Sequence, residues 1–345
     1  MNYTTIEHTD LKVSKICLGT MTWGQQNNES DGHQQMSYAT DHGVNFFDTA
    51  EMYSIPPKQE TYGSTERIIG SWFKQTGMRD KVILATKIAG KAGFTKHIRD
   101  ETYTRQAFRD AVEGSLSRLA TDYIDLYQLH WPERKTNYFG SRGYNHSENE
   151  QWIDNIHEIL VTLGDLIKEG KIRYIGVSNE TPWGVMRYLN EFREHGLPRM
   201  VSIQNPYSLL NRSFETGLAE IAIREQIKLL AYSPLAFGVL SGKYLNGLQP
   251  EKARLTLFPH YTRYANPQVV EATERYVKLA RHHNLSPAQM ALAFVNSRPF
   301  VQSNIIGATT VDQLKENIES INLVLDPALI EAIDHIHELY PDPAP

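Results

Sequence analysis

The sequence predicts an α/β protein whose strands close into a (β/α)8 barrel. Eight short apolar runs follow one another along the 345 residues, and amphipathic stretches with helical periodicity lie between them. Continuous apolar runs of this length are typical of parallel strands that helices cover. Eight strand–helix units in succession favour one closed barrel, so residues 1–345 are expected to form a single domain. The predicted strands are Ile16–Gly19, Asn45–Asp48, Val82–Thr86, Ile124–Leu129, Ile172–Val177, Val201–Gln204, Lys228–Tyr232 and Asn304–Gly307.

The helices are predicted from the spacing of apolar side chains. Arg105–Leu119 and Ile156–Ile167 each place apolar residues along one face of a helix with 3.6 residues per turn. Thr102, Ser213 and the pair Ser286-Pro287 are residue types that begin helices, so we expect helices to start there.

Three further segments complete the predicted architecture. Tyr3–Lys15 alternates in polarity and contains a turn, which predicts a small hairpin across the bottom of the barrel. Trp131–Gln151 and Ser233–Asn266 are long connections after strands four and seven, and loops of this length are usually functional or disordered. Both are expected to emerge at the catalytic face. Ala328–Leu339 predicts an extra C-terminal helix on the outside.

Composition argues against several classes of protein. The net charge is −5 with both signs interspersed, so the sequence shows no basic face for nucleic acid. No apolar run approaches the roughly 20 residues of a membrane-spanning helix. The N-terminus lacks the apolar segment of a signal peptide. Cys17 is the only cysteine, which excludes an intramolecular disulfide and fits the expected location in a reducing cytoplasm.

Four residues with complementary chemistry stand at or just beyond the ends of predicted strands. Asp48 closes the second strand, Tyr53 follows it, Lys87 closes the third run, and His130 follows the fourth. Because the C-terminal ends of barrel strands meet at one mouth, these side chains are predicted to lie together. Each alone is more often a helix cap, a packed aromatic, a solvated charge or a core histidine. The combination of all four favours catalysis.

This set can move a proton to a carbonyl oxygen. Hydride addition builds negative charge on that oxygen, and a free tyrosine with a pKa of about 10 is a poor acid at neutral pH. The ammonium of Lys87 is expected to lower the pKa of Tyr53, and Asp48 is expected to hold Lys87 by an ion pair. A neutral His130 can donate a hydrogen bond that orients the substrate oxygen.

Polar residues at the ends of later strands can hold a nicotinamide cofactor. Ser178, Asn179 and Gln204 offer donors and acceptors to its carboxamide, and Tyr232 offers a flat aromatic face to its ring. A credible alternative makes Ser178-Asn179 the N-cap of the helix that follows, before Thr181-Pro182. One residue could serve both roles.

The segment Ser233–Lys243 offers a site for a pyrophosphate. Gly238 and Ser241 allow close backbone approach, and Lys243 supplies positive charge. The sequence has no G-x-G-x-x-G turn, which argues against Rossmann-type binding. No pair of histidines has convincing zinc-ligand spacing, so no metal is predicted. A hydrolase would need such ligands or a Gly-x-Ser-x-Gly turn, and both are missing.

Motifs distributed over nearly the whole chain resemble those of the aldo-keto reductase superfamily. The chain is also similar to the β-subunits of voltage-gated potassium channels. The motifs are Asp41-His42-Gly43-Val44-Asn45-Phe46-Phe47-Asp48-Thr49-Ala50-Glu51-Met52-Tyr53, Ala85-Thr86-Lys87, Leu129-His130-Trp131-Pro132, Gly176-Val177-Ser178-Asn179, Ile203-Gln204-Asn205-Pro206-Tyr207-Ser208, Tyr232-Ser233-Pro234-Leu235 and Ile306-Gly307-Ala308-Thr309.

The resemblance implies a reductase of aldehydes or ketones that uses a nicotinamide cofactor, usually NADPH/NADP+. It assigns Tyr53 as the acid/base, Asp48 and Lys87 as the pair that tunes it, and His130 as the group that positions the carbonyl. It also extends the predicted cofactor site to Thr20, Met21, Asp48, Ser233, Pro234, Leu235 and Leu240.

The resemblance places the adenosine end of the cofactor at the last barrel helix. The N-terminus of a helix favours an anion such as a 2′-phosphate. In the branch that resembles the channel β-subunits, a serine, a glutamine, a glutamate and an asparagine hold this end, and here threonine replaces the serine. The matching residues, with the glycine that precedes them, are Gly307, Thr309, Gln313, Glu316 and Asn317.

One departure leaves the preference for NADPH over NADH open. Many other members of the superfamily have an arginine where Gln313 stands. Lys243 and Arg254 could supply the missing charge. For Arg254, a solvated cation is an equally good interpretation.

Two functions are in contention, a reductase and a slow-turnover NADP(H)-binding redox sensor or partner-binding module. The channel β-subunits carry asparagine at the position of His130, so the histidine favours the reductase. The substrate is expected to be a small carbonyl compound in an aromatic pocket, and neither its identity nor the oligomeric state is readable; a monomer is compatible. The predicted pocket residues are Trp23, Tyr53, His130 and Trp131, with Tyr138 or Phe139 as further candidates, although both tryptophans could equally be rim packing.

Overall fold

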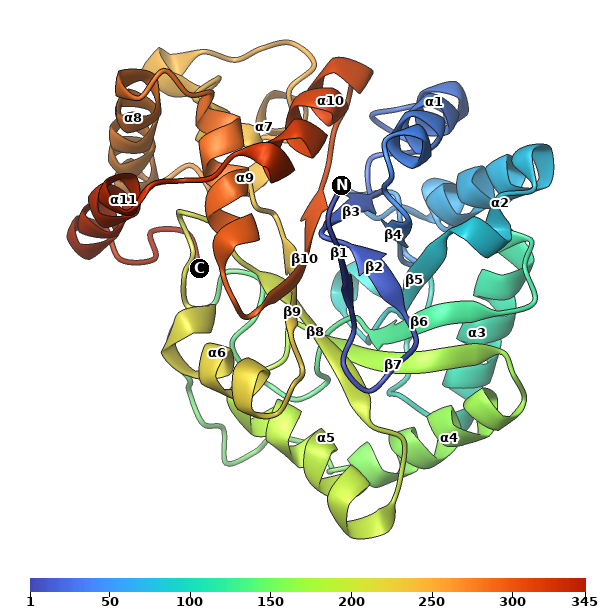
Figure 1. The fold of residues 1–345 in the computed structure, drawn as a ribbon. Helices are drawn as coiled ribbons and strands as arrows, with labels where there is room; N and C mark the ends of the chain where they lie inside the picture. The colour runs from blue at the N-terminus through green and yellow to red at the C-terminus, as the bar shows by residue number, and fades with distance from the viewer.

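Eight parallel strands close into a barrel in the order β10-β3-β4-β5-β6-β7-β8-β9, which confirms the predicted (β/α)8 class (Figure 1). The computed structural model describes residues 1–345. All eight predicted strands are present, and the largest error is in the last, which begins three residues earlier than expected. The barrel strands are β3 (Ile16–Gly19), β4 (Phe46–Asp48), β5 (Ile83–Ile88), β6 (Ile124–Leu129), β7 (Ile172–Ser178), β8 (Met200–Pro206), β9 (Leu229–Tyr232) and β10 (Val301–Ile306).

Helices surround the barrel, and none of them combines the length and apolar character needed to cross a membrane. The α-helices are α1 (Glu29–Asp41), α2 (Ser64–Thr76), α3 (Arg105–Leu119), α4 (Ile156–Lys168), α5 (Pro182–His195), α6 (Phe214–Arg224), α7 (Arg254–Leu257), α8 (Pro267–His282), α9 (Pro287–Ser297), α10 (Val311–Glu319) and α11 (Pro327–Leu339). The 3-10 turns are η1 (Gln59–Thr61), η2 (Arg79–Lys81), η3 (Gly93–Thr95), η4 (Ala236–Ser241), η5 (Leu245–Gly247) and η6 (Ser320–Asn322).

The predicted helix starts agree with the structure in part. Ser286 caps α9 by accepting a hydrogen bond from a backbone N–H, and Pro287 opens that helix. Ser213 precedes α6 as expected, but its hydroxyl donates to Asn211 rather than capping the helix. The prediction of Thr102 was wrong, because Thr104, two residues later, accepts the capping hydrogen bond of α3.

The interior of the barrel changes from apolar to polar toward the C-terminal ends of the strands. Phe46, Ala85 and Leu126 belong to one buried apolar cluster that also includes residues of β3, β8, β9 and β10. Side chains two residues apart on a strand share a face. The inward positions above these three are therefore polar: Asp48, Lys87 and Gln128, all buried.

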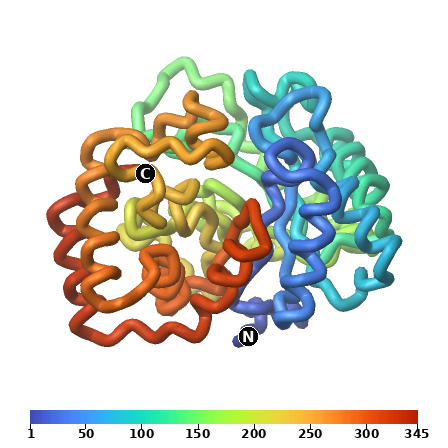
Figure 2. Tube along the Cα trace, turned by 90° about the horizontal axis from the view of Figure 1, so that it is seen from above, coloured from blue at the N-terminus to red at the C-terminus, as the bar shows by residue number.

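The N-terminal hairpin closes the opposite end of the barrel. β1 (Tyr3–Thr5) and β2 (Lys12–Ser14) pair antiparallel, as predicted. Ile6, Leu11 and Val13 pack into the same apolar cluster as the lower interior layer. Figure 1 shows the hairpin crossing the barrel, and Figure 2 places the N-terminus at the end away from the loop after β6.

The two long connections follow β6 and β9, as predicted. The connection after β6 rises above the barrel in Figure 2 and contains no helix or strand before α4. The connection after β9 is more ordered than its sequence suggested, since it contains η4, η5 and α7. The extra C-terminal helix, α11, packs against α8 on the outside, which confirms that prediction.

Candidate active site

A buried ion pair lies at the polar end of the barrel interior. Lys87 on β5 donates hydrogen bonds of 2.7 Å from Nζ to Oδ2 of Asp48, the last residue of β4, and to the backbone carbonyl oxygen of Thr49. The lysine side chain has no exposed surface, and that of Asp48 has almost none. The two strands are neighbours in the sheet, so strand pairing alone brings these charges together.

The other two predicted catalytic side chains face this pair. Lys87 Nζ lies 5.1 Å from the centre of the Tyr53 ring. The ring centres of Tyr53 and His130 are 5.7 Å apart, in an edge-on arrangement with an interplanar angle of 73°. The structure therefore brings Asp48, Tyr53, Lys87 and His130 into one buried group at the barrel mouth, where the sequence placed them.

Two glutamine amides fix the orientation of Asp48. Gln204 on β8 donates from Nε2 to Asp48 Oδ1 at 2.8 Å, and Gln128 on β6 donates to the same oxygen at 3.4 Å. Sequence reasoning missed Gln128, although its place two residues before His130 on an inward-facing strand was a usable signal. It also assigned Gln204 to the cofactor alone, whereas the Gln204 amide nitrogen is occupied by Asp48.

The pKa of Tyr53 is shifted upward, although the sequence analysis expected Lys87 to lower it. Burial raises the pKa of Tyr53 and Asp48 adds to the rise, while Lys87 lowers it; the net direction is upward. The predicted lowering by the lysine is thus present but smaller than the effect of burial. Burial also lowers the pKa of Lys87, but Asp48 and Tyr53 outweigh it and the net direction is upward. Tyr53 therefore keeps its proton and Lys87 its charge at neutral pH.

His130 is held as a neutral imidazole. Burial, and then the charge of Lys87, keep its pKa well below the ordinary value. Its Nδ1 atom is buried without a hydrogen-bond partner. The backbone of His130 does have a side-chain partner, because Asn179 donates from Nδ2 to the His130 carbonyl oxygen at 2.9 Å.

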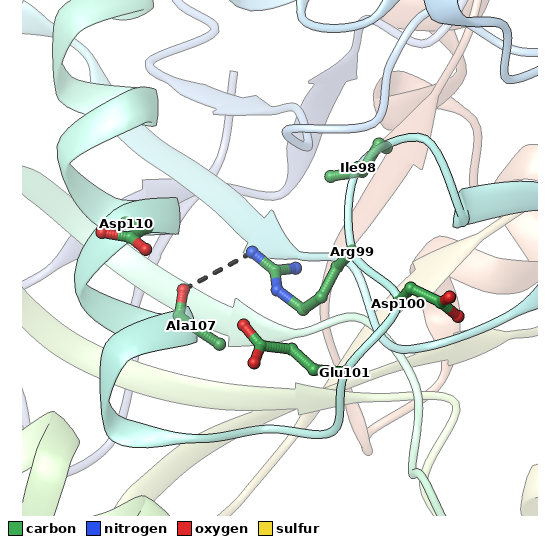
Figure 3. Close-up of a pocket in the computed structure, with 6 residues that line it drawn as sticks. All are labelled: Ile98, Arg99, Asp100, Glu101, Ala107 and Asp110. Carbon is green, nitrogen blue, oxygen red and sulfur yellow. Dashed lines mark hydrogen bonds between the residues drawn. The ribbon is translucent and has the colours of Figure 1, made fainter.

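A second buried ion pair holds the loop that carries Tyr53. Glu51 accepts a 2.9 Å hydrogen bond from Arg99 and a 2.6 Å hydrogen bond from the backbone N–H of Ala89. Figure 3 shows Arg99 in the wall of a pocket of about 410 Å³ outside the catalytic group, donating to the carbonyl oxygen of Ala107. Arg99 is a positioning residue that sequence reasoning missed.

The residues predicted to meet the nicotinamide form a connected set beside the four. Ser178 donates to the backbone oxygen of Gln204 at 2.7 Å, and Tyr232 donates to Asn179 Oδ1 at 2.6 Å. The alternative reading of Ser178-Asn179 as a helix cap is excluded, because Thr181 caps α5. The hydroxyl of Tyr232 is engaged, so a ring stacked on this residue would meet its face.

The predicted pyrophosphate segment adopts an unusual backbone. Ser233, Ala236, Phe237 and Gly238 all have positive φ angles, and the N–H groups of Ala236 and Gly238 close tight turns by donating to the carbonyl oxygens of Ser233 and Leu235. At Gly238 a β-carbon would lie 2.6 Å from Lys243 Nζ, so the glycine makes room for the lysine. Burial lowers the pKa of Lys243, and no carboxylate pairs with it. Pro234, Leu235, Leu240 and Ser241 lie in the same segment, with Leu240 buried.

Arg254 is a buried cation without a carboxylate partner, so it is not the solvated cation that its sequence also allowed. It begins α7 and is 7% exposed, and none of its three guanidinium nitrogens has a hydrogen-bond partner. Its guanidinium carbon lies 4.6 Å from the centre of the Phe237 ring and 5.5 Å from that of Tyr261. Burial lowers the pKa of Arg254. An unpaired buried guanidinium is costly, and an anion would compensate that cost.

The predicted adenosine-end residues cluster around the start of α10. Gln313 accepts hydrogen bonds from the backbone N–H and the hydroxyl of Thr309, at 3.0 and 3.1 Å. Asn317 donates to the carbonyl oxygen of Gly307 at 3.0 Å. Glu316 accepts a hydrogen bond from Ser286 of α9 and so is partly turned toward that helix.

The loop after β3 supplies the remaining predicted cofactor residues. Thr20 is fully buried and donates to the backbone oxygen of Asp48 at 2.9 Å. The carbonyl oxygen of Met21 accepts the backbone N–H of Ile55. These bonds tie the loop to the segment around Tyr53, so Thr20 supports the catalytic group through backbone contacts.

Aromatic side chains line one side of the catalytic group. The ring of Trp131 lies 5.0 Å from that of His130, 5.6 Å from that of Phe94 and 5.7 Å from that of Phe139, centre to centre. Tyr138 packs against the buried cluster that contains Tyr53 and Trp131.

Trp23, by contrast, does not lie in this wall. Its side chain is fully buried in the main core, and its Nε1 atom donates to Gln35 of α1 at 3.2 Å. Gly32 of the same helix packs against its indole ring. The sequence-based assignment of Trp23 to the substrate pocket is wrong, because the loop after β3 turns the indole under α1.

The fold and the site define a barrel oxidoreductase, and comparison with known proteins agrees. The pattern of the aldo/keto reductase family matches residues 15–338, so the chain belongs to this family. It is 52% identical to Protein tas of Escherichia coli (strain K12) over 347 residues that cover both chains completely.

More distant relatives extend the comparison. An aldo-keto reductase of Babesia bovis is 38% identical over 282 residues, which cover 76% of this chain and 98% of that protein. A probable voltage-gated potassium channel subunit beta of Arabidopsis thaliana is 28% identical over 351 residues, which cover 99% and 98%.

The unpaired state of Arg254 leads to a stability prediction. Arg254→Met removes a buried charge that has no partner, so the free energy of unfolding of the cofactor-free protein should rise by about 1 kcal/mol. The control is Arg212→Met, because Arg212 is equally buried but paired with Glu215 and Asp334. That change should instead lower the free energy of unfolding by about 1 kcal/mol, because it removes hydrogen bonds to two partly exposed carboxylates. Urea unfolding measures both, and an equal loss in the two variants would contradict the prediction.

Proposed function

We propose that this protein is an NADPH-dependent reductase that converts aldehydes or ketones to alcohols, with Tyr53 as the proton donor. The observation that carries the proposal is the buried group of Asp48, Tyr53, Lys87 and His130 at the barrel mouth. Membership of the aldo/keto reductase family supports the class of reaction. The substrate is a small carbonyl compound.

The four side chains divide the proton chemistry among them. Tyr53 gives its hydroxyl proton to the substrate oxygen as negative charge develops there. The charge of Lys87 stabilises the phenolate that remains, and Asp48 holds Lys87 at 2.7 Å. The neutral ring of His130 donates a hydrogen bond to the same substrate oxygen. A bound nicotinamide would supply the hydride.

The residues present fit a dinucleotide phosphate. Arg254 is a buried cation without an anion, and Lys243 is a partly buried cation without one. The N-terminus of α10 offers N–H groups to phosphate oxygens. Ser178, Asn179, Gln204 and Tyr232 would hold the nicotinamide end.

A redox-sensing or partner-binding role is the less favoured alternative. The observation that supports this alternative is the 28% identity to a probable voltage-gated potassium channel subunit beta. The group of four side chains favours turnover, because the imidazole of His130 packs against the ring of Tyr53.

The role of Tyr53 gives the first test of this proposal. Tyr53→Phe removes the donated proton, so kcat for reduction of a reactive aldehyde with NADPH should fall by about 100- to 10,000-fold. The affinity for NADPH, measured by fluorescence quenching, should remain. Tyr276→Phe is the control, because it removes a buried hydroxyl that has no partner on the outer helix α8. Undiminished kcat in Tyr53→Phe would remove Tyr53 as the acid.

The pKa directions give a pH profile. Reduction needs a protonated Tyr53, whose pKa is raised, and a neutral His130, whose pKa is well below the ordinary value of about 6.5. The kcat/KM for reduction should therefore be flat from about pH 6 to about pH 9. Alcohol oxidation needs the phenolate and should instead rise with pH across that range. An acid limb near pH 6.5 that disappears in His130→Gln would show that His130 titrates normally.

The charge of Lys243 gives a test of cofactor preference. If Lys243 meets the 2′-phosphate, Lys243→Ala should raise the Kd for NADPH about ten- to a hundredfold, the loss of a charge-assisted hydrogen bond, and change that for NADH far less. Lys252→Ala, which removes an exposed lysine of the same loop, serves as the control. Equal weakening of both cofactors would place Lys243 away from the 2′-phosphate.

A further inference from the structure

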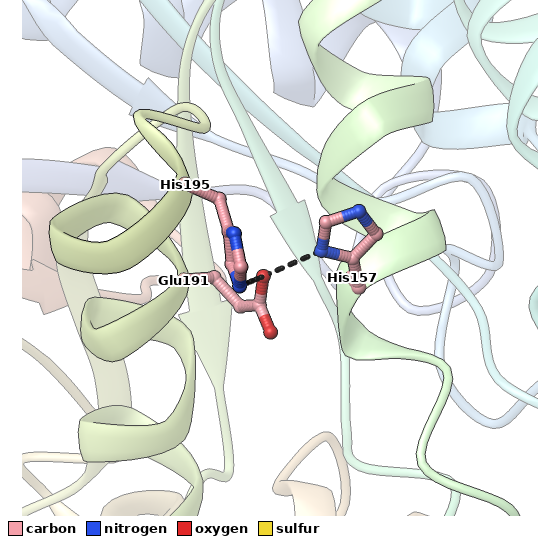
Figure 4. A group of neighbouring side chains, drawn as sticks. All are labelled: His157, Glu191 and His195. Carbon is pink, nitrogen blue, oxygen red and sulfur yellow. Dashed lines mark hydrogen bonds and ion pairs between the residues drawn. The ribbon is translucent and has the colours of Figure 1, made fainter.

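Two histidines and a glutamate meet on the outer helices, in a cluster that takes no part in the proposed reduction. His157 lies at the start of α4, and Glu191 and His195 stand one turn apart on α5. His157 Nδ1 is 2.7 Å from Glu191 Oε2, and His195 Nε2 is 3.8 Å from the same oxygen. Figure 4 shows both rings turned toward the carboxylate from the two helices.

An ordinary contact between helices accounts for only part of this arrangement. The hydrogen bond between His157 and Glu191 needs one imidazole. The nitrogen of His195 is too far from Glu191 for a hydrogen bond, yet it faces the same oxygen. One ligand atom from each of the three residues lies within 4.8 Å of the others. A metal ion bound at about 2.0–2.2 Å would hold its ligand atoms roughly 3–3.5 Å apart, so small side-chain rotations suffice.

The surroundings of Glu191 suit a ligand to a cation. Its side chain is 4% exposed, and its other oxygen, Oε1, accepts a 2.5 Å hydrogen bond from Arg187. Arg187 is in turn held by Asp154 at 2.8 Å. Such an outer partner fixes the orientation of a ligating carboxylate and leaves Oε2 to the metal. Glu194 adds a further carboxylate 3.9 Å from His195 Nε2, so the negative charges outnumber the single guanidinium.

We infer that His157, Glu191 and His195 form a binding site for a divalent transition metal ion, of which Zn²⁺ is the best match. Two imidazoles and one carboxylate are the ligand types that zinc accepts, whereas magnesium and calcium prefer oxygen alone. Both histidine side chains are about half exposed, so the ion can enter from solvent and water can complete its coordination. Bound zinc would tie α4 to α5.

The sequence predicted no metal because no pair of histidines has zinc-ligand spacing along the chain. Glu191 and His195 are four residues apart, but His157 is 34 residues before Glu191, so the cluster exists only after α4 and α5 have packed.

The test is zinc titration of the full-length protein after removal of metal. Calorimetry with ZnCl2 should show one zinc ion per chain, and zinc should raise the Tm. His195→Ala should weaken zinc binding at least about tenfold and abolish the rise in Tm. His283→Ala, which removes an exposed histidine at the end of α8, is the matched control and should behave as wild type.

A double variant, His157→Ala with His195→Ala, makes the result decisive. Its Tm without zinc, compared with that of wild type, shows that it folds. Equal zinc affinity in wild type and the double variant would mean an adventitious ion bound elsewhere. That result, or a wild-type protein that shows no zinc-dependent change at all, would overturn the proposal.

Discussion

The ion pair between Lys87 and Asp48 is the interaction on which the architecture of the site depends. Two opposite charges with almost no exposed surface would destabilise the barrel if either stood alone, because a buried unpaired charge is costly. The pair is tolerated because neighbouring groups complete its hydrogen bonds: the carbonyl oxygen of Thr49 accepts from the lysine, and the amides of Gln204 and Gln128 donate to the aspartate. The polar layer therefore lies directly above the apolar part of the barrel interior.

Burial and charge act in opposite directions on Tyr53. The dry surroundings that raise its pKa also strengthen its interaction with the ammonium of Lys87. In the proposed reduction, the phenol would keep its proton until a stronger base, the developing alkoxide, is present. The same burial keeps His130 neutral. One physical cause, exclusion of water, thus sets the protonation states of both groups.

The predicted catalytic and cofactor-binding residues differ in whether their cations have an anionic partner in the protein. Lys87 has an anion in the protein, whereas Arg254 and Lys243 have none. A cation that is already paired with a carboxylate of the protein contributes little binding free energy to an anionic ligand. Under the proposed function, these two cations would be the groups that gain most from binding the phosphates of the cofactor.

The sequence by itself determined the barrel and the four catalytic candidates. Eight apolar runs in order leave few alternatives, and strand ends such as Asp48 and Lys87 must meet at one mouth whatever the loops do. Tertiary structure alone decided what depends on packing between distant segments: that Trp23 turns under α1, that Gln204 binds Asp48, that Arg254 is buried, and that His157 meets Glu191. Local pattern fixes which face of an element is buried, but not which side chain from another element it will meet.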